Sequence, residues 1–257
     1  MLKSERLLYI TGVIRDKGVI TIREIMDACG VSDMTARRDL GELEKEGRLT
    51  RIHGGAQGLD FSLDHELSHE EKTSHEGAEK FQIALRAAQL VHDEDIVFMG
   101  PGTTVEALAE QLKGKDVYVV TTSHPVFMTL CNDPVAKVFL VGGEYRGKTR
   151  SFVGELTCEQ VRSFTFGKAF IGCNGIHANN IMSYSPAEGV IQKAALDNSQ
   201  YRYLLADHTK FNRMDFYTYC HLQDFDLCVT DAGIDPELRA AAEGYVTVEV
   251  AKARGAA

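Results

Sequence analysis

Seven short apolar runs recur between residues 96 and 250, and they constrain the fold more than any other feature of the sequence. The segments between them have helical character, and three begin with a pattern typical of a helix start, at Thr103, Ser185 and Asp235. Short apolar strands that alternate with capped helices are typical of an α/β domain built on a largely parallel sheet. The runs are IVFM, VYVV, KVFLV, KAFIG, YLLA, DLCVT and YVTVEV.

The first fifty residues follow another pattern, in which three short helices succeed one another. Residues 5–16 space their apolar side chains by three and four, as an amphipathic helix does. A second helix begins at Thr21 with a capping box and ends at Gly30. A third begins at the N-cap Ser32 and runs to about Gly47. Helix, tight turn with glycine, helix is the sequence form of a helix-turn-helix.

The residues after these helices, RLTRIHGGA, alternate apolar and polar side chains before two glycines, as in the strands and tip of a small β-wing. We therefore predict a winged helix-turn-helix domain over residues 1–58. Residues 59–75 are polar without sustained periodicity, which predicts a linker. A larger α/β sensor domain is expected to occupy residues 76–257, so the fold class is α/β with two domains.

Charge divides unevenly between the two predicted domains. Residues 1–58 hold ten Lys/Arg and nine Asp/Glu, a balance of +1, and the remaining residues hold 18 and 28, a balance of −10. An acidic body repels a polyanion such as DNA. Any DNA contact must therefore be confined to the front domain.

Composition and cysteine spacing exclude several classes of protein. No apolar run reaches the roughly 18 residues needed to span a bilayer, and the first twenty residues lack the apolar centre of a signal peptide. The six cysteines are scattered, without a CxxC pair or a zinc-binding spacing with histidine. We expect a cytoplasmic protein with reduced thiols, no metal, no cofactor and no membrane partner.

The helix that begins at Ser32 has the composition of a DNA recognition helix. Arg37 and Arg38 point about 100° apart, so that one can reach a guanine edge while the other reaches a phosphate. Asp39 is expected to pair with a neighbouring basic residue or to face solvent. The alternative is a charged surface helix whose arginines pair with nearby acids. The predicted DNA contacts are Ser32, Met34, Thr35, Arg37, Arg38, Arg51 and His53.

A second motif, MGPGTTVE, lies where a strand gives way to a helix. Glycines let the backbone approach a ligand, and free amides at a helix start favour an anion such as phosphate. An ordinary turn that needs glycine for its geometry alone is the alternative. Further strand ends at TTSHP, VGGE and ADHTKF favour phosphate, because loops after parallel strands converge at one edge of a sheet.

Charged residues near these loops have the chemistry to bind a sugar phosphate. Lys210 can neutralise phosphate charge, while Asp207 and Glu188 can accept hydrogen bonds from sugar hydroxyls. Lys193, shortly after Glu188, is either a further contact or a surface lysine. These loops and charges together predict a site for a phosphorylated sugar.

The run VSDMTARRDLGELEKEGRLTRIHGGA resembles the winged helix-turn-helix of DeoR-family bacterial transcriptional repressors. The similarity continues through EKFQIA, GPGTTVE, LVGGEYR, SFVGE, KAFIGCNGI and ADHTKF. The resemblance implies a C-terminal domain like the ribose-5-phosphate isomerase fold, kept as an effector sensor. It implies that the residues at or near the effector are Gly102, Thr103, Thr104, Gly142, Gly143, Glu188, Asp207 and Lys210.

One departure from the family pattern concerns the sugar. Many members have an aspartate two residues before the GTT, where this chain has Gly100, so a contact from that aspartate is absent. GPGTT fits a branch of the family that controls lactose use. For that branch the resemblance implies tagatose 6-phosphate as the inducer.

These observations predict a repressor that binds operator DNA as a homo-oligomer, a dimer or a tetramer, and is released by a phosphorylated sugar. For release, the sugar must bind the released state more tightly than the DNA-bound state. One alternative is a sugar-phosphate isomerase-like enzyme, which needs a general base. Glu188 and Asp207 are candidates, but no acid and base pair stands out. A protein-interaction module would explain neither the wing nor the phosphate loops.

Overall fold

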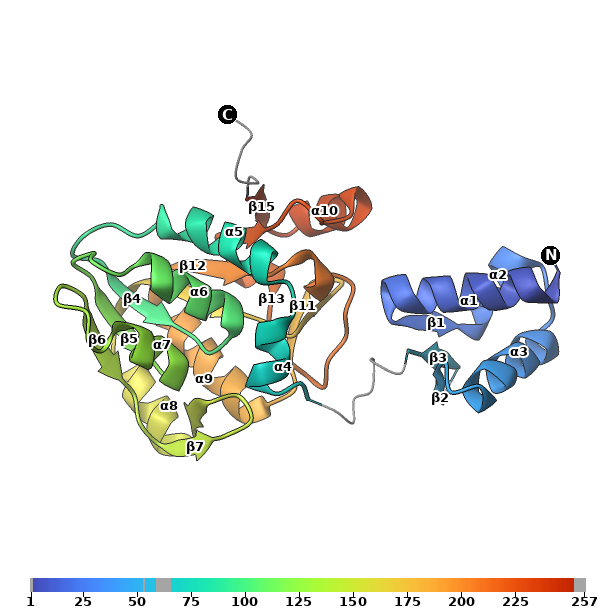
Figure 1. The fold of residues 1–257 in the computed structure, drawn as a ribbon, viewed down its shortest axis with the longest axis horizontal. Coiled ribbons are helices and arrows are strands. Elements are labelled where there is room, and N and C mark those ends of the chain that lie inside the picture. The colour runs from blue at the N-terminus through green and yellow to red at the C-terminus, as the bar shows by residue number, and fades with distance from the viewer. Residues whose placement is uncertain (1, 53, 59–65, 252–257) are drawn as a thin grey trace. The chain divides into compact units, whose positions relative to one another are not determined.

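The structure of the chain is a computed structural model, which describes residues 2–52, 54–58 and 66–251. Two compact units make up this described part, one drawn chiefly from the residues before Leu67 and one chiefly from those after it (Figure 1). No helix among the described residues is long and apolar enough to cross a membrane.

The first unit combines three helices with a small antiparallel sheet of order β1-β3-β2. Thr21 and Glu24 form the predicted capping box, Gly30 ends the second helix in the left-handed conformation, and the Ser32 hydroxyl accepts a hydrogen bond from the Thr35 amide. The helix-turn-helix is therefore confirmed. The elements are α1 (Lys3–Lys17), β1 (Val19–Thr21), α2 (Ile22–Cys29), α3 (Asp33–Lys45), β2 (Thr50–Ile52) and β3 (Gly55–Gln57).

The sequence analysis misses β1, whose three residues lie between two helices. β1 pairs with β3, with Ile20 opposite Ala56. Gly55 lies so close to β1 that an added Cβ would stand 2.1 Å from the Ile20 carbonyl oxygen, so the position requires glycine. The core beneath is apolar, and its most buried members include Ile10, Ile20, Ile25, Leu40 and Leu43.

A seven-stranded sheet forms the centre of the second unit. Its order is β15-β14-β12-β9-β4-β5-β6, and every neighbouring pair is parallel. Each of the seven apolar runs supplies one strand, which confirms the predicted parallel sheet. The strands are β4 (Ile96–Met99), β5 (Tyr118–Thr121), β6 (Lys137–Leu140), β9 (Phe166–Gly172), β12 (Ser199–Leu205), β14 (Leu227–Thr230) and β15 (Thr247–Val250).

Helices cover both faces of this sheet. Phe98 packs in the core beneath one layer of helices, whereas Val97 and Met99 pack in the core beneath the other. Burial on both faces explains why the strands are continuous apolar runs. One layer comprises α5 (Gly77–Ala88), α6 (Thr103–Gln111) and α7 (His124–Leu130), and the other comprises α8 (Glu155–Arg162), α9 (Pro186–Asp197) and α10 (Pro236–Glu243).

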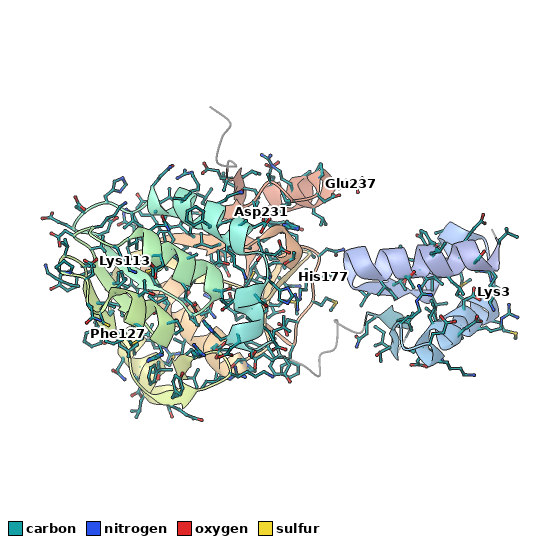
Figure 2. The ribbon with its side chains drawn as sticks, in the orientation of Figure 1. Lys3, Lys113, Phe127, His177, Asp231 and Glu237 are labelled. Atoms are coloured by element: carbon teal, nitrogen blue, oxygen red, sulfur yellow. The ribbon has the colours of Figure 1, made fainter. Side chains whose placement is uncertain are left out.

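The amino ends of the parallel strands lie at one edge of the sheet, and their carboxyl ends lie at the opposite edge. Lys113, just past the end of α6, lies at the amino edge, and Asp231, just past β14, lies at the carboxyl edge (Figure 2). Each helix that follows a strand of the sheet begins at the carboxyl edge, because the parallel strands all end there. Candidate ligand residues in these loops therefore share one side of the unit.

Several short elements of this unit are absent from the sequence prediction, because three to five residues carry little periodic signal. A hairpin follows β6, and a three-stranded antiparallel sheet forms from segments after β9 and β12. The short elements are β7 (Glu144–Arg146), β8 (Ser151–Val153), β10 (Gly175–His177), β11 (Asn180–Ser183), η2 (His208–Lys210), β13 (Tyr217–His221) and η3 (Leu222–Asp224).

The predicted cap at Thr103 is wrong. Gly102 is the N-cap of α6, and no side chain caps the helix. Glu106 would complete a capping box at this helix, but its carboxylate lies 2.8 Å from the ring nitrogen of His69 instead. The predicted caps of α9 and α10, at Ser185 and Asp235, are confirmed.

The predicted linker contains a helix. Residues 59–65 lie outside the described residues, whereas α4 (His69–Ser74) begins with a capping box between Ser68 and Glu71. The sequence reasoning passed over this Ser-x-x-Glu pattern because the helix has no buried residue and so no apolar periodicity.

All six cysteines are free, and four of them are buried. Within residues 2–52, 54–58 and 66–251, no group of three or more His, Cys, Asp and Glu side chains is placed to hold a metal ion.

Candidate functional site

The exposed face of α3 is the candidate DNA-contact surface. Met34 is 81% exposed, and Arg37 and Arg38 are also exposed. Ala36 and Leu40, on the opposite side of the helix, are buried in the core of the first unit. The helix is therefore amphipathic, with its cationic residues directed to solvent.

Arg37 and Arg38 differ in their hydrogen-bond and ion-pair partners. Arg37 Nε lies 2.6 Å from Asp33 Oδ1, and this hydrogen bond raises the pKa of Arg37. Arg38 makes no hydrogen bond or ion pair with any residue that the structure describes. The hydroxyl oxygens of Ser32 and Thr35 lie 3.1 Å apart at the helix start. Arg38 is thus the freer cation for an incoming phosphate or base.

Asp39 lies elsewhere than the sequence predicts. It neither faces solvent nor pairs with a neighbour, because its carboxylate is fully buried against Arg6 of α1. Arg6 Nε lies 2.8 Å from Oδ2, and Nη2 lies 3.3 Å from Oδ1. The hydrogen bond to Asp39 raises the pKa of Arg6. This two-pronged pair ties the recognition helix to α1 and keeps the acid away from the contact surface.

The wing adds a third arginine to this surface. A Cβ added at Gly41 of α3 would lie 3.7 Å from a guanidinium nitrogen of Arg51, so the Arg51 side chain lies over the helix. The Arg51 amide donates to Glu44 Oε1 at 3.0 Å, which ties β2 to α3. His53, also predicted as a contact, lies outside the described residues. We call Met34, Arg37, Arg38 and Arg51 the α3 face.

The second candidate site lies at the carboxyl edge of the seven-stranded sheet. β4 leads through residues 100–102 into α6, whose start has no side-chain cap. Gly102 has a φ of 138°, and an added Cβ there would meet open space. Thr103 is half-buried and Thr104 is buried in the first turn. The amides of this helix start are therefore available to an anion.

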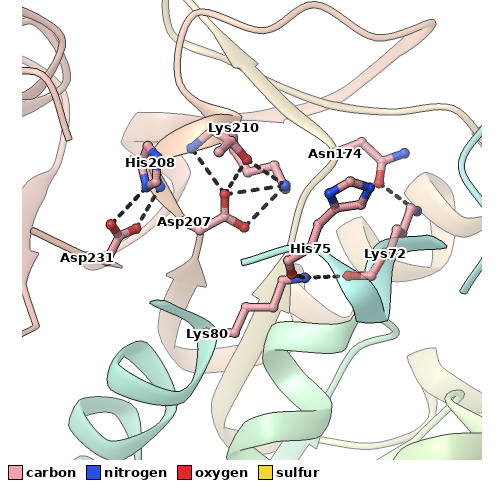
Figure 3. Close-up of polar contacts among 9 residues, drawn as sticks. Lys72, His75, Lys80, Asn174, Asp207, His208, Lys210 and Asp231 are labelled. Carbon is pink, nitrogen blue, oxygen red and sulfur yellow. Dashed lines mark hydrogen bonds and ion pairs between the residues drawn. The ribbon is translucent and has the colours of Figure 1, made fainter. Parts of the chain in front are cut away.

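Lys210, Asp207 and Lys80 meet at the same edge (Figure 3). Asp207 follows β12 after one intervening residue, is fully buried, and has its Oδ2 3.2 Å from Lys210 Nζ. Burial opposes ionisation of Asp207, but Lys210, a hydrogen bond from Thr209 and the charge of Lys80 together lower its pKa. Oδ2 accepts no hydrogen bond from the described residues, so it can accept one from a ligand hydroxyl.

Lys80 is the member of this group that the sequence analysis misses. Its side chain is buried, and its ammonium donates to the backbone oxygens of Lys72 and His75. Burial and then the charge of Lys210 lower the pKa of Lys80. Lys80 and Lys210 flank the carboxylate of Asp207, and the charges of Glu76 and Glu106 also act on Lys80, so the two lysines bring cationic donors for a phosphate to an edge that also holds carboxylates.

A signal for Lys80 is present in the sequence. It lies on the buried stripe of α5 together with Ile83, Ala84 and Ala87. A lysine at a helical position that otherwise carries only apolar residues is expected to have a buried partner or a function.

Glu188, in the first turn of α9, lies in a second polar group at this edge. The β7–β8 hairpin brings Ser151 Oγ to 2.6 Å from Glu188 Oε1, and Thr149 donates to the same oxygen. These three residues are buried, and Arg146 Nη1 lies 3.9 Å from that oxygen. The hairpin residues could not be predicted, because only the fold brings them to Glu188.

The two glycines after β6 have different surroundings. An added Cβ at Gly143 would stand 1.9 Å from Thr157 Oγ1 and 2.7 Å from the Val153 carbonyl oxygen, so close packing against α8 requires glycine there. An added Cβ at Gly142 would meet no atom within 4 Å. Gly142 is therefore open to a ligand, whereas packing alone accounts for Gly143.

The predicted effector residues thus gather at the carboxyl edge of the sheet. Lys193, which the sequence left open between a further contact and a surface lysine, lies apart from them. Lys193 pairs with Asp197 on the outer side of α9 and is a surface lysine. Glu188, Asp207, Lys210 and the start of α6 all lie where strands end or where helices leave that edge. Whether each touches an effector stays a prediction.

Two family models match the chain, one for each unit. Residues 6–60 match the model described as the DeoR-like helix-turn-helix domain. Residues 75–232 match the model described as the DeoR C terminal sensor domain. Together they span the α3 face and the carboxyl-edge site.

Curated relatives match over almost their full length. The lactose phosphotransferase system repressor of Lactococcus lactis subsp. lactis is 43% identical over 251 residues, which cover 96% of this chain and 98% of the relative. The repressor of the same name from Streptococcus mutans is 42% identical over 241 residues, which cover 93% and 96%.

The solved structures that align with the chain are more distant in sequence. The probable sor operon regulator of Shigella flexneri aligns with a TM-score of 0.41 at 13% identity, covering 66% of this chain and 90% of that one. Ribose 5-phosphate isomerase A of Neisseria gonorrhoeae aligns with a TM-score of 0.38 at 18% identity, covering 57% and 55%.

Proposed function

This chain belongs to the DeoR family of transcriptional regulators, and on that premise we propose that it represses an operon for lactose uptake through a phosphotransferase system. A phosphorylated sugar bound at the carboxyl edge of the sheet releases it from the operator. The observation that carries the effector half is the group formed by buried Lys80, buried Asp207 and half-buried Lys210 beside the uncapped start of α6. The chain acts as a DNA-binding regulator and not as an enzyme, like the relatives named repressors.

The α3 face is the DNA-contact surface in this proposal. Arg38 reaches a base edge or a phosphate without first breaking an ion pair, and Arg51 approaches from the wing. Arg37 must exchange Asp33 for DNA, or reach DNA while Asp33 orients it. One near-neutral unit gains little from general attraction to phosphate, so two units that occupy two half-sites supply the affinity. We therefore propose a homo-oligomer, a dimer or a tetramer, in the cytoplasm.

The effector lies with its phosphate between Lys80, Lys210 and the amides at the start of α6. Two ammonium groups and a helix start together match a dianion. Asp207 Oδ2, which is ion-paired with Lys210 but accepts no hydrogen bond from the described residues, and the hydrogen-bonded Glu188 then accept hydrogen bonds from the sugar hydroxyls. Tagatose 6-phosphate is the proposed sugar, supported by the lactose phosphotransferase names of the full-length relatives.

Release follows from a difference in affinity. If the operator-bound state takes up sugar phosphate less well than the released state, sugar phosphate weakens operator binding by the same factor. A factor of about 5- to 150-fold is the usual range for such coupling.

A band-shift titration tests the repressor assignment. The full-length protein is titrated onto DNA from the promoter region of its own gene, with and without tagatose 6-phosphate. We expect a specific complex that the sugar dissociates. Absence of any specific complex at low salt would contradict the repressor assignment, and an unchanged complex would contradict the sugar.

A thermal-shift screen of hexose and pentose phosphates tests the effector site, because stabilisation grows with ligand concentration over Kd. The Lys210→Met variant is expected to lose the shift and to repress without induction. Lys193→Met is the matched control, because Lys193 lies on the outer side of α9, and it should respond as the wild type does. An equal response of both variants would show that the pocket is misplaced.

A further inference from the structure

Helix α4 is attached to the carboxyl-edge region of the second unit by several side-chain contacts, in addition to a hydrogen bond from the His69 amide to the Lys148 carbonyl and an ion pair between Glu70 and Arg150. His69 Nε2 lies 2.8 Å from Glu106 Oε2, in the first turn of α6. Lys72 Nζ donates to Asn174 Oδ1 at 2.9 Å, in the loop after β9. At its carboxyl end, the helix presents the carbonyl oxygens of Lys72 and His75 to the ammonium of Lys80 (Figure 3).

These attachments decide whether α4 forms at all. The helix has six residues, none of them buried. A helix of that length is unstable in water without tertiary contacts, since isolated helices shorter than about 12 residues are marginal. Whether α4 is helical therefore depends on the contacts that hold it to the rest of the second unit.

Lys80 contacts both α4 and the proposed phosphate site. Two of its three N–H donors bond to the backbone oxygens of Lys72 and His75. Its charge also interacts with those of Lys210, Asp207 and Glu106. One donor remains for a phosphate oxygen. A single buried ammonium thus joins the ligand position to the end of the helix.

α4 also has a special place in the chain. Fewer than a dozen residues separate it from β3, the last strand of the first unit. It is the first helix of the second unit, so the chain that carries the α3 face is anchored through α4.

We propose that α4 is the coupling element of this repressor, held by Lys80 and held more tightly when a phosphorylated ligand occupies the carboxyl-edge site than when none is bound. The inference rests on the proposed function. When α4 is held tightly, the position at which the chain enters the second unit is fixed. This restricts the DNA-binding unit of each protomer, and it opposes the arrangement in which the DNA-binding units of two protomers occupy two half-sites.

The physical cause is the charge of Lys80. Burial and the charge of Lys210 lower the pKa of Lys80 and so disfavour its charged form. A phosphate dianion favours the ammonium form, and a charged donor makes stronger hydrogen bonds to the carbonyls of α4. His69 and Lys72 contribute attachment but do not by themselves sense the ligand.

Hydrogen exchange on the full-length protein tests the fastening without any ligand. Lys80→Met removes the donors to α4, and we expect the amides of residues 72–75 to exchange about tenfold faster or more. Lys115→Met is the matched control, because Lys115 Nζ likewise donates to two backbone oxygens, of Ala88 and Val91, at the other edge of the sheet. Unchanged exchange in α4 of Lys80→Met would overturn the proposal.

A second variant covers the case in which Lys80→Met does not fold. His69→Leu breaks the attachment to Glu106 and leaves Lys80 in place, with His92→Leu as its control, since the exposed His92 lies just before β4. We expect His69→Leu to bind promoter DNA about two- to thirtyfold more tightly than the wild type and His92→Leu to bind equally. Unchanged DNA affinity in His69→Leu overturns the coupling role of α4.

The ligand arm uses tagatose 6-phosphate and inorganic phosphate as probes. We expect the probe that stabilises the wild type to slow exchange in α4 of the wild type and of Lys115→Met, but not of Lys80→Met. Thermal stabilisation without slower exchange in α4 would overturn coupling while the effector site stands. If neither probe stabilises the protein, the effector assignment fails, and the two variant experiments still decide the role of α4.

Discussion

The carboxylate of Asp39 lies fully buried against the guanidinium of Arg6, with Oδ2 2.8 Å from Nε. Asp39 directly follows Arg38, which makes no hydrogen bond or ion pair with the described residues. One residue of the RRD sequence therefore orients the helix on α1, while the residue before it points to solvent.

The first prediction concerns this buried pair. Asp39→Asn leaves Arg6 without its counter-charge inside the first unit, and removing one partner of a buried pair is strongly destabilising. We expect the melting temperature of the unit to fall by about 10 °C or more, measured by calorimetry of the full chain. Asp33→Asn breaks the exposed pair with Arg37 instead and should change the melting temperature little. Equal effects would contradict a special role for Asp39.

The second prediction ranks three arginines of the first unit. Arg38→Ala should weaken operator binding by about 10- to 100-fold, as expected for loss of a base contact. Arg37→Ala should weaken it less, because Asp33 already occupies that guanidinium. Arg23→Ala, an exposed arginine of α2 paired with Asp27, serves as the control with no effect on specific binding. Fluorescence anisotropy with operator DNA measures all three, and a larger effect for Arg23 would refute the assigned surface.

The third prediction separates packing from ligand contact at two adjacent glycines. Gly143→Ala places a methyl group 1.9 Å from Thr157 Oγ1, so the chain must shift, and we expect a clear loss of thermal stability without ligand. Gly142→Ala meets open space and should leave the unfolding temperature of the ligand-free protein unchanged. If Gly142→Ala instead abolishes thermal stabilisation by tagatose 6-phosphate, that position contacts the sugar. Equal stability of the two variants would contradict the packing described around α8.

The fourth prediction is a proton uptake on effector binding. In the empty site the pKa of Lys80 lies below the ordinary lysine value, so part of Lys80 is deprotonated at alkaline pH. A bound dianion raises that pKa, and binding then takes up protons. Above pH about 8 the phosphate is already fully ionised, so it contributes no protons of its own. We expect affinity to fall as pH rises through the lowered pKa, since the protein must gain the proton to bind.

Calorimetry in two buffers of different ionisation enthalpy measures this uptake directly. Lys80→Met should bind more weakly and show no uptake in the alkaline range. Lys115→Met should behave as the wild type does. Uptake that persists in Lys80→Met would assign the proton to another group and contradict the placement of phosphate beside Lys80.

The sequence predicts the parts of the fold that depend on local patterns. Seven continuous apolar runs require burial on both faces, and a parallel sheet between helical layers provides it. The caps at Thr21 and Ser32 work within four residues of chain, so they could be read without any tertiary information. The α4 helix was missed because it lacks the apolar stripe that such reasoning depends on.

For the candidate effector site, too, the sequence predicts only what depends on local patterns. The uncapped glycine turn before α6 and the ADHTKF loop mark the carboxyl edge, because in a parallel sheet every strand ends there. Which side chains meet at that edge depends on contacts between distant segments. Lys80 reaches Asp207 across more than a hundred residues of chain, and the hairpin carries Ser151 to Glu188.

By itself, the sequence therefore determined the two folds, the predicted recognition helix and the edge at which the candidate effector residues lie, because periodicity, capping and strand ends are local properties. Only the tertiary structure decided that Asp39 is buried against Arg6, that Gly143 serves packing, and that Lys80 donates to the carbonyl oxygens of α4 while its charge acts on Asp207. Burial and long-range pairing set the charge and direction of a side chain, and neither is encoded by spacing along the chain.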